Sequence, residues 1–145
     1  MLAQSTKLSF FVPDSSESFE TTYFDSGISA GFPSPADDFK EERISLDKEL
    51  IKNKEATFFA RVNGQSMIDA GLGDNDLLII DRSLSPSHNK IAVCFLDGDF
   101  TVKRLKLDNG DLWLQPENTK YKPIKITEEN EFIIWGIVTN VIKKV

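Results

Sequence analysis

Hydrophobic and polar positions alternate over short distances along most of the chain after residue 57. Short runs rich in Val, Ile, Leu, Phe and Trp are separated by segments that contain Gly, Asn and Asp, which is typical of antiparallel strands joined by tight turns. The run Leu77-Leu78-Ile79-Ile80 has no polar position, so it predicts a short strand buried on both faces. The runs that we expect to form strands are 57–62, 77–80, 91–96, 100–107, 112–115 and 132–142.

The polar segments between these runs predict hairpins. Asp97-Gly98 and Asn109-Gly110 are dipeptides that favour two-residue turns between antiparallel strands. The final run, 132–142, predicts either one long strand or two strands that meet at Gly136. The expected body is therefore mostly β and antiparallel.

Helical periodicity is confined to one short segment. Ser45 is a plausible N-cap for a helix at 46–51, in which Leu46, Leu50 and Ile51 share a face. One short helix before the strands is the expectation.

The first 40 residues differ from the rest of the chain. They hold eight serines, and Pro33 and Pro35 interrupt regular structure. This composition predicts an extended arm, and its aromatic side chains suggest that the arm docks on an apolar surface; a disordered leader is the alternative. Six of the eleven phenylalanines lie here, namely Phe10, Phe11, Phe19, Phe24, Phe32 and Phe39.

Charge and composition exclude several classes of function. The net charge of −6 over 145 residues disfavours direct nucleic-acid binding, which needs an excess of cations. One cysteine (Cys94) and one histidine (His88) leave no ligands for a Cys- or His-based metal cage, so we expect no cofactor. No apolar run approaches the ~20 residues of a membrane span, and the N-terminus lacks a secretory signal, so a cytoplasmic protein is expected.

A first candidate for chemistry is the turn Gly64-Gln65-Ser66-Met67 between two expected strands. A glycine two residues before a serine permits a tight turn that exposes the hydroxyl and the neighbouring amides. Ile68 replaces the second glycine of a hydrolase nucleophile elbow, so that motif is absent. An ordinary surface turn is the alternative.

A second candidate is Lys103, in the run 100–107. Alternation along a strand puts Lys103 on the same side as Leu105 and Leu107, where partial burial would lower its pKa. A neutral lysine can act as a general base for a serine hydroxyl. Both sides of this run carry apolar residues, so alternation leaves open a surface lysine with its amine in solvent.

Other polar side chains have simpler interpretations. His88 lies in an expected loop and is a poor member of a Ser–His–Asp triad. Cys94 lies in an apolar run and is expected to be a packing residue. Asp74 and Asp76 are expected to be solvated loop carboxylates, without the third ligand that a metal site needs.

Several separated motifs, taken in order, resemble the LexA/UmuD-type self-cleaving serine peptidases. Gly64, Ser66 and Met67 precede Lys103 in its setting 100–105. The resemblance runs from about Ser26 to the C-terminus, and the short arm is similar to that of the UmuD-like members. Its other motifs are Ala-Gly-Phe-Pro-Ser-Pro at 30–35, Gly-Asp-Asn-Asp-Leu-Leu-Ile-Ile-Asp at 73–81 and Ile-Trp-Gly-Ile-Val at 134–138.

The resemblance implies a Ser–Lys dyad that cleaves its own chain. Ser66 would be the nucleophile, Lys103 the general base, and the backbone amides of Ser66 and Met67 the oxyanion hole. The bond between Ala30 and Gly31 would be cleaved, in cis or in trans, at a rate that increases as the pH rises from about 7 toward 10.

The resemblance also implies an architecture. It predicts a compact antiparallel β body of the LexA/UmuD C-terminal type, with one short helix and an extended N-terminal arm. The expected divisions are a cleavable arm at 1–31, a linker at 32–44 and a Ser–Lys peptidase-like β domain at 45–145.

The implied partners follow from the family. Such proteins form homodimers, are cleaved with the help of RecA filaments, and join a UmuC-like polymerase subunit in error-prone translesion synthesis during the SOS response to DNA damage. The alternatives are an SOS-linked transcriptional regulator and a non-catalytic protein-binding module. A regulator is disfavoured because the first 40 residues hold two lysines, Lys7 and Lys40, against six acidic residues.

Overall fold

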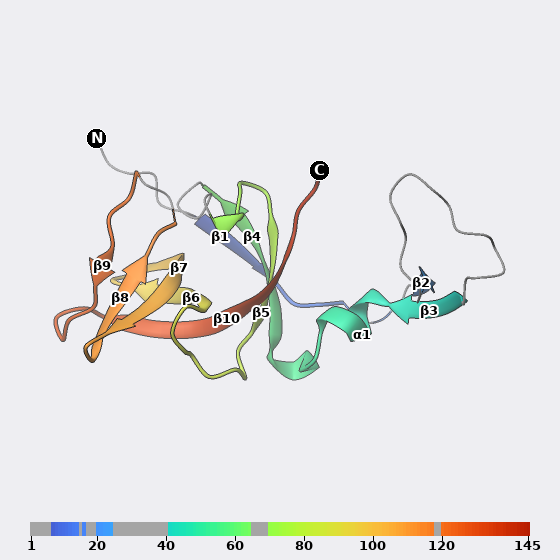
Figure 1. Ribbon diagram of the computed structural model, residues 1–145, viewed down its shortest axis with the longest axis horizontal. Coiled ribbons are helices and arrows are strands. Elements are labelled where there is room, and N and C mark those ends of the chain that lie inside the picture. Colours follow the sequence, from blue (N-terminus) through green and yellow to red (C-terminus); the bar gives the residue numbers. More distant parts are fainter. Residues whose placement is uncertain (1–6, 15, 17–19, 25–40, 65–69, 118–119) are drawn as a thin grey trace. The chain divides into compact units, whose positions relative to one another are not determined.

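A computed structural model describes residues 7–14, 16, 20–24, 41–64, 70–117 and 120–145 (Figure 1). The chain divides into two compact units. One contains the residues up to Pro13 together with Asn53–Val145, and the other is Asp14–Lys52. None of the described helices is long and apolar enough to cross a membrane. The division into 1–31, 32–44 and 45–145 stays a prediction, because it concerns cleavage and not packing.

The larger unit is built on one eight-stranded sheet. Its strand order is β1-β4-β5-β10-β6-β7-β8-β9, and every neighbouring pair is antiparallel. The mostly β, antiparallel fold class expected from the sequence is therefore confirmed. The strands are β1 (Lys7–Phe11), β4 (Thr57–Asn63), β5 (Leu77–Asp81), β6 (Ile91–Leu96), β7 (Asp99–Asp108), β8 (Asp111–Gln115), β9 (Ile124–Lys125) and β10 (Phe132–Ile142).

The smaller unit contains a two-stranded ladder and the single described α-helix. Strand β2 (Glu20–Phe24) pairs with β3 (Glu41–Ser45), and α1 (Leu46–Leu50) follows directly. Ser45 is the N-cap residue, as predicted, but its buried hydroxyl makes no capping hydrogen bond. The expected apolar helix face is not buried, since no residue of α1 is.

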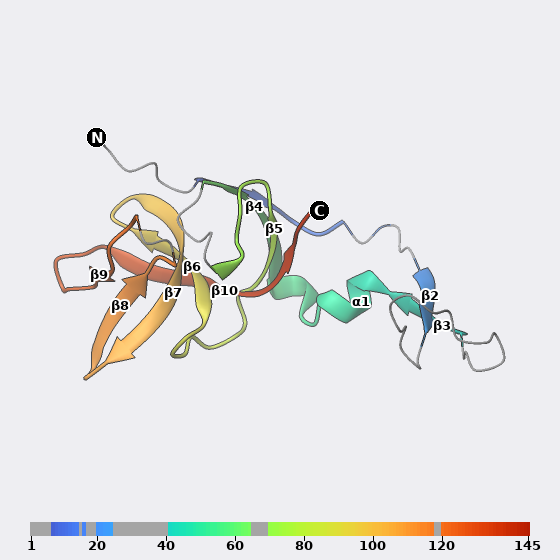
Figure 2. The same cartoon turned by 45° about the horizontal axis from the view of Figure 1, so that its top comes forward.

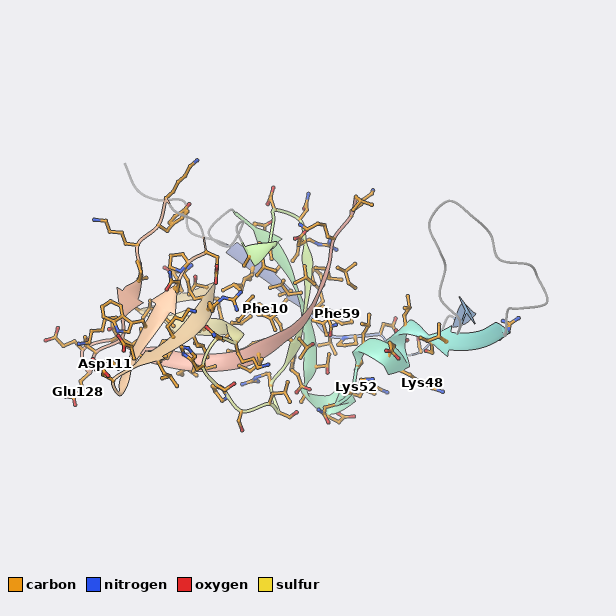
Figure 3. All side chains as sticks on the ribbon, viewed as in Figure 1. Phe10, Lys48, Lys52, Phe59, Asp111 and Glu128 are labelled. Atoms are coloured by element: carbon orange, nitrogen blue, oxygen red, sulfur yellow. The ribbon has the colours of Figure 1, made fainter. Side chains whose placement is uncertain are left out.

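Beyond α1, the segment up to β4 makes contacts close in sequence and also hydrogen bonds to the end of β5, where Asn53 Nδ2 donates to Asp81 Oδ2 and the Arg82 amide donates to the Ala56 carbonyl. The Lys52 ammonium donates a hydrogen bond to the Lys48 carbonyl, and Figure 3 labels both lysines. A 3-10 turn at Lys54–Ala56 then leads into β4.

The two predicted hairpins are present, with turns of two residues. Asp97 and Gly98 have φ of 47° and 96°, and Asn109 and Gly110 have φ of 50° and 83°. Positive φ at both central positions is what a twisted two-residue hairpin needs, and Asn, Asp and Gly adopt it most readily. Figures 1 and 2 both show the resulting β7–β8 hairpin.

The final strand, β10, is continuous and joins the two parts of the sheet (Figure 1). Its first half pairs with β6 and its second half with β5, with register shifts between Ile134 and Gly136 and between Val138 and Asn140. Of the two alternatives that the sequence left open, one long strand is the observed one. Gly136 leaves no room for a side chain, since a Cβ there would lie 2.5 Å from Ile80 Cγ2.

The core consists of two clusters of buried side chains. The first lies between β4, β5, β6 and β7, and the second between β6, β7, β8 and β10. Members of the first are Ala60, Val62, Leu72, Leu78, Ile80, Val93 and Val102. Members of the second are Ala92, Cys94, Leu105, Leu114 and Ile137.

The sequence pattern missed the three strands that precede residue 46. Of these, β1 is held by long-range pairing with β4, and its neighbours in sequence give no strand signal. Its alternation of inward and outward positions covers only Leu8 to Phe11, which is too short to read as a period. The expected docking of the arm on an apolar surface is confirmed for Phe10, which packs against the first core cluster.

We predict that Gly136→Ala lowers the free energy of unfolding by about 2 kcal/mol, because the new methyl group overpacks the site of closest approach to buried Ile80. Urea denaturation measures the change. The matched control on the same strand is Ile133→Ala, whose side chain is 56% exposed and whose loss should cost less than about 0.5 kcal/mol. Equal unfolding midpoints for the two variants would contradict the close approach.

Candidate active site

Four of the residues singled out by the sequence lie outside the described part of the chain. Ser66 and Met67 fall within 65–69, and Ala30 and Gly31 within 25–40. The described structure defines instead the residues on either side of 65–69 and the strand that carries Lys103. The site is built here from those parts.

Hydrogen bonds join the residues just before segment 65–69 to a turn at residues 74–76, further along the chain. The Gly64 amide donates a hydrogen bond of 3.2 Å to Asp74 Oδ1. The Val62 amide donates to the Asp76 carbonyl at 2.9 Å, and the Asn75 amide donates to the Val62 carbonyl at 2.7 Å. We call these five residues (Val62, Gly64, Asp74, Asn75 and Asp76) the loop clamp.

Asp76 anchors the loop clamp in the protein interior. It is only 4% exposed, and its Oδ2 accepts hydrogen bonds from the Gly73 amide at 2.7 Å and from Lys143 Nζ at 2.6 Å. The expectation of solvated carboxylates therefore describes Asp74, which is exposed, and is wrong for Asp76. The reason is long-range: Lys143 is 67 positions away in sequence and supplies the compensating charge.

Lys103 lies in the middle of β7, directly opposite Ala92 of β6. Side chains paired in this way share a face of the sheet, so Lys103 lies on the same face as Ala92 and, two positions along β6, Cys94. Both of these residues belong to the second core cluster. Lys103 is 7% exposed, which answers the question that alternation left open: this lysine is buried.

Burial has a direct electrostatic consequence for the Lys103 amine. Loss of hydration penalises the ammonium form and lowers the pKa of Lys103 from its usual 10.5 to about 8, while the neighbouring Cys94 acts in the opposite direction. About a tenth of such amines are neutral at pH 7, compared with about one in a few thousand for a solvated lysine. A neutral amine held on a rigid strand can accept a proton from a hydroxyl.

The remaining candidate residues have structural roles. His88 Nδ1 accepts a hydrogen bond of 3.0 Å from the Leu107 amide, which fixes its loop to the end of β7. Cys94 is fully buried, and burial raises the pKa of its thiol to about 12, so it remains protonated. Among the described residues, no group of three or more His, Cys, Asp or Glu side chains could hold a metal ion.

The sequence reasoning missed Asp76 and Lys143 as supports of this site. Nothing local could have found the pair, since the two residues meet only through the fold. The one usable signal was the compact motif Gly-Asp-Asn-Asp before an apolar strand, whose acidic residues accept hydrogen bonds from the amides of Gly64 and Gly73.

We predict that stability rises with pH because of Lys103. Between about pH 8 and 10.5 the unfolded chain holds a proton on this lysine that the folded chain has lost, so the free energy of unfolding increases with pH. The gain is about 3 kcal/mol over that interval. Below pH 8 both states are protonated and the contribution is flat.

The measurement is urea denaturation at several pH values for the parent and Lys103→Met. Other titrating groups are common to both proteins, so the difference between the two curves isolates Lys103. Parallel curves would show that the amine is solvated in the folded protein.

We further predict that Asp76→Ala destabilises the protein by about 2 kcal/mol, because the Gly73 amide and the Lys143 ammonium lose the buried carboxylate that accepts their hydrogen bonds. Asp74→Ala is the matched control, two positions away in the same turn and exposed, and should cost less than about 1 kcal/mol. Thermal unfolding compares them. A larger loss for Asp74→Ala than for Asp76→Ala would reverse the assigned order of importance.

Comparison with known proteins assigns the family. Residues 22–139 match the family described as Peptidase S24-like. Protein MucA of Salmonella typhimurium is 42% identical over 114 residues, which cover 78% of this chain and 77% of MucA. Protein ImpA of Shigella flexneri is 39% identical over 132 residues, 91% of this chain and 90% of ImpA. The LexA repressor of Acidithiobacillus ferrooxidans is 34% identical over 119 residues, 80% of this chain and 58% of the repressor. Motif order, antiparallel fold and these matches together make the chain a member of the Peptidase S24-like family.

Proposed function

We propose that the chain is a self-cleaving serine peptidase with Ser66 as nucleophile and Lys103 as general base. The observation that carries the proposal is the buried amine of Lys103, with its pKa lowered to about 8, in a chain of the Peptidase S24-like family. A lysine that serves only solubility has no reason to lie at 7% exposure opposite Ala92. The loop clamp supports the proposal, because it ties the chain just before the segment that contains Ser66 to the turn at residues 74–76.

The proposed reaction is peptide-bond hydrolysis in two steps. Ser66 Oγ attacks the carbonyl carbon of Ala30 while Lys103 Nζ takes the hydroxyl proton, and the amides of Ser66 and Met67 stabilise the oxyanion. The Gly31 amine leaves with the proton from Lys103. Water then hydrolyses the acyl-enzyme, which yields the Ala30 carboxylate and regenerates Ser66.

The scissile bond would lie in the connection between β2 and β3. That connection, 25–40, separates the last residue of β2 from the first of β3. Hydrolysis would thus leave β1 and β2 on one product, and β3 and the other seven strands of the larger sheet on the other. Cleavage of this kind can act as a switch, because it changes which surfaces the arm covers.

We propose that the switch serves mutagenic DNA synthesis after DNA damage. The resemblance to UmuD-like proteins supports a cytoplasmic homodimer that is cleaved with the help of RecA filaments. The trimmed dimer would then join a UmuC-like subunit of an error-prone translesion polymerase. The net charge of −6 supports a role through protein partners in preference to direct DNA binding.

The test is the intact mass of the purified protein after incubation at pH values from 6 to 10. We expect loss of residues 1–30 from the parent and no loss from Ser66→Ala or Lys103→Ala. The rate should rise about tenfold per pH unit below pH 8 and level off above it, because only the neutral amine acts as base.

Gly31→Glu is the control at the cleavage site. It should block cleavage and leave the melting temperature unchanged. A flat pH profile, or cleavage that survives in Lys103→Ala, would remove Lys103 from the mechanism. Absence of cleavage in every protein, with RecA filaments on single-stranded DNA present, would favour a non-catalytic binding module.

A further inference from the structure

The arm contributes an edge strand to the sheet of the larger unit. Strand β1 pairs with β4 along its whole length, from Lys7 opposite Asn63 to Phe11 opposite Phe59, and β4 pairs with β5 on its other side. Figures 1 and 2 both show β1 alongside β4. The backbone groups of β4 on this side are therefore satisfied by a segment that enters from the far N-terminal end of the chain.

The side chains of β1 divide cleanly between two faces. Leu8 and Phe10 face the sheet's core side, opposite Val62 and Ala60, and both pack against the first core cluster. The alternate positions Ser9 and Phe11 face outward, and Phe11 is 50% exposed. An extended segment with apolar side chains at two alternate positions is what this edge accepts.

Phe10 occupies an aromatic socket. Its ring centroid lies 4.9 Å from that of Phe100 on β7 and 4.8 Å from that of Trp135 on β10, both in edge-to-face geometry. Opposite Phe10 in the ladder is Ala60, whose small side chain leaves room for the ring. Figure 3 labels Phe10 among the side chains of these strands.

Trp135, one side of the aromatic socket, is held by further contacts of its own. The ring centroids of Trp135 and Phe58 lie 5.1 Å apart, and Arg82 Cζ lies 4.5 Å from the centroid of the Trp135 ring. Arg82 Nε also donates a hydrogen bond of 3.0 Å to the Trp135 carbonyl. A cation over the face of the indole and a hydrogen bond to its backbone carbonyl are contacts of Trp135 that do not involve Phe10.

We propose that the edge of β4 that pairs with β1, together with the Phe100–Trp135 socket, is a docking groove for an extended segment of the pattern Leu-x-Phe. In the intact chain its occupant is residues 7–11. The groove holds this segment by main-chain pairing and by Phe10, so it retains the segment without a covalent connection to the rest of the chain. This is strand addition to an exposed sheet edge with one aromatic anchor.

The inference rests on the proposed function only in its consequence. If the Ala30–Gly31 bond is hydrolysed, the arm stays in the groove, and cleavage and arm release are two separate events. The short β2–β3 ladder is marginal on its own in water, so β1 is the main attachment. Any partner that needs the β4 edge must then displace β1 with a strand of its own.

The experiment cuts the chain independently of its own chemistry. A site-specific protease sequence is inserted between Asp14 and Glu20 of the full-length Ser66→Ala protein, which puts the cut between β1 and β2. After digestion at about 10 µM protein, gel filtration and native mass spectrometry report whether the N-terminal fragment remains with the body. We expect it to remain.

The matched variants are Phe10→Ala and Phe11→Ala, two phenylalanines on opposite faces of one strand. Phe10→Ala should weaken retention by about 100-fold, the loss typical of truncating a buried aromatic anchor. Phe11→Ala should change retention less than about threefold. Circular dichroism before digestion checks that both variants are folded, and Leu8→Ala provides a milder second test of the inward face.

Two results would overturn the groove. One is loss of the N-terminal fragment, after digestion, from the protein that keeps Phe10. The other is equal retention of the fragment by Phe10→Ala and Phe11→Ala. Because Ser66 is absent from these proteins, the outcome is independent of self-cleavage. If the parent protein fails the cleavage test under "Proposed function" while the digested Ser66→Ala protein retains its fragment, the proposed function is wrong and the docking groove stands.

Discussion

The register of β10 is the constraint on which the rest of the molecule depends. This strand lies between β5 and β6, and its two register shifts let one half follow each neighbour. The segment that contains Ser66 connects β4 to β5, on one side of β10, while Lys103 lies on β7, on the other side. The two parts of the candidate site are therefore held in relation by a strand that contributes no chemical group to it. Gly136, at one of the shifts, is where the approach to Ile80 leaves no space for a side chain.

Burial of the Lys103 amine lowers the stability of the fold and, in the proposed mechanism, supports reactivity. Placing a lysine on the face of Ala92 and Cys94 costs folding free energy at neutral pH, because the ammonium form is poorly hydrated there. In the proposed mechanism, the same burial provides a base near physiological pH. A buried lysine would only destabilise a β protein in which it had no function. Lys103 is therefore the described residue that says most about the proposed function of this protein.

The sequence predicted those parts of the fold that are decided locally. The residue types of the hairpin dipeptides determine the turn geometry, and the lack of polar residues in the run 77–80 indicates a buried strand. Both features could therefore be predicted from the sequence. Strand β1 was not visible, because its partner is more than forty residues away. The burial of Asp76 was not predicted for the same reason, since the ammonium group that pairs with its carboxylate belongs to Lys143, far away in sequence. The burial of Lys103 could be predicted only in part. Alternation along the strand left two possibilities, a buried lysine and a surface lysine, and only the pairing of β6 with β7 in the structure distinguished them.

The order of synthesis gives the Asp76–Lys143 pair a further consequence. Strand β10 and Lys143 follow every other described element in the chain, so a ribosome makes them last. Until residue 143 has left the exit tunnel, β5 and β6 have no common neighbour and Asp76 has no ammonium partner. A nascent chain consequently carries β1, β4 and Lys103 before it carries the strand that joins the two parts of the sheet. If the proposed self-cleavage needs the folded sheet, it cannot begin until β10 has been made.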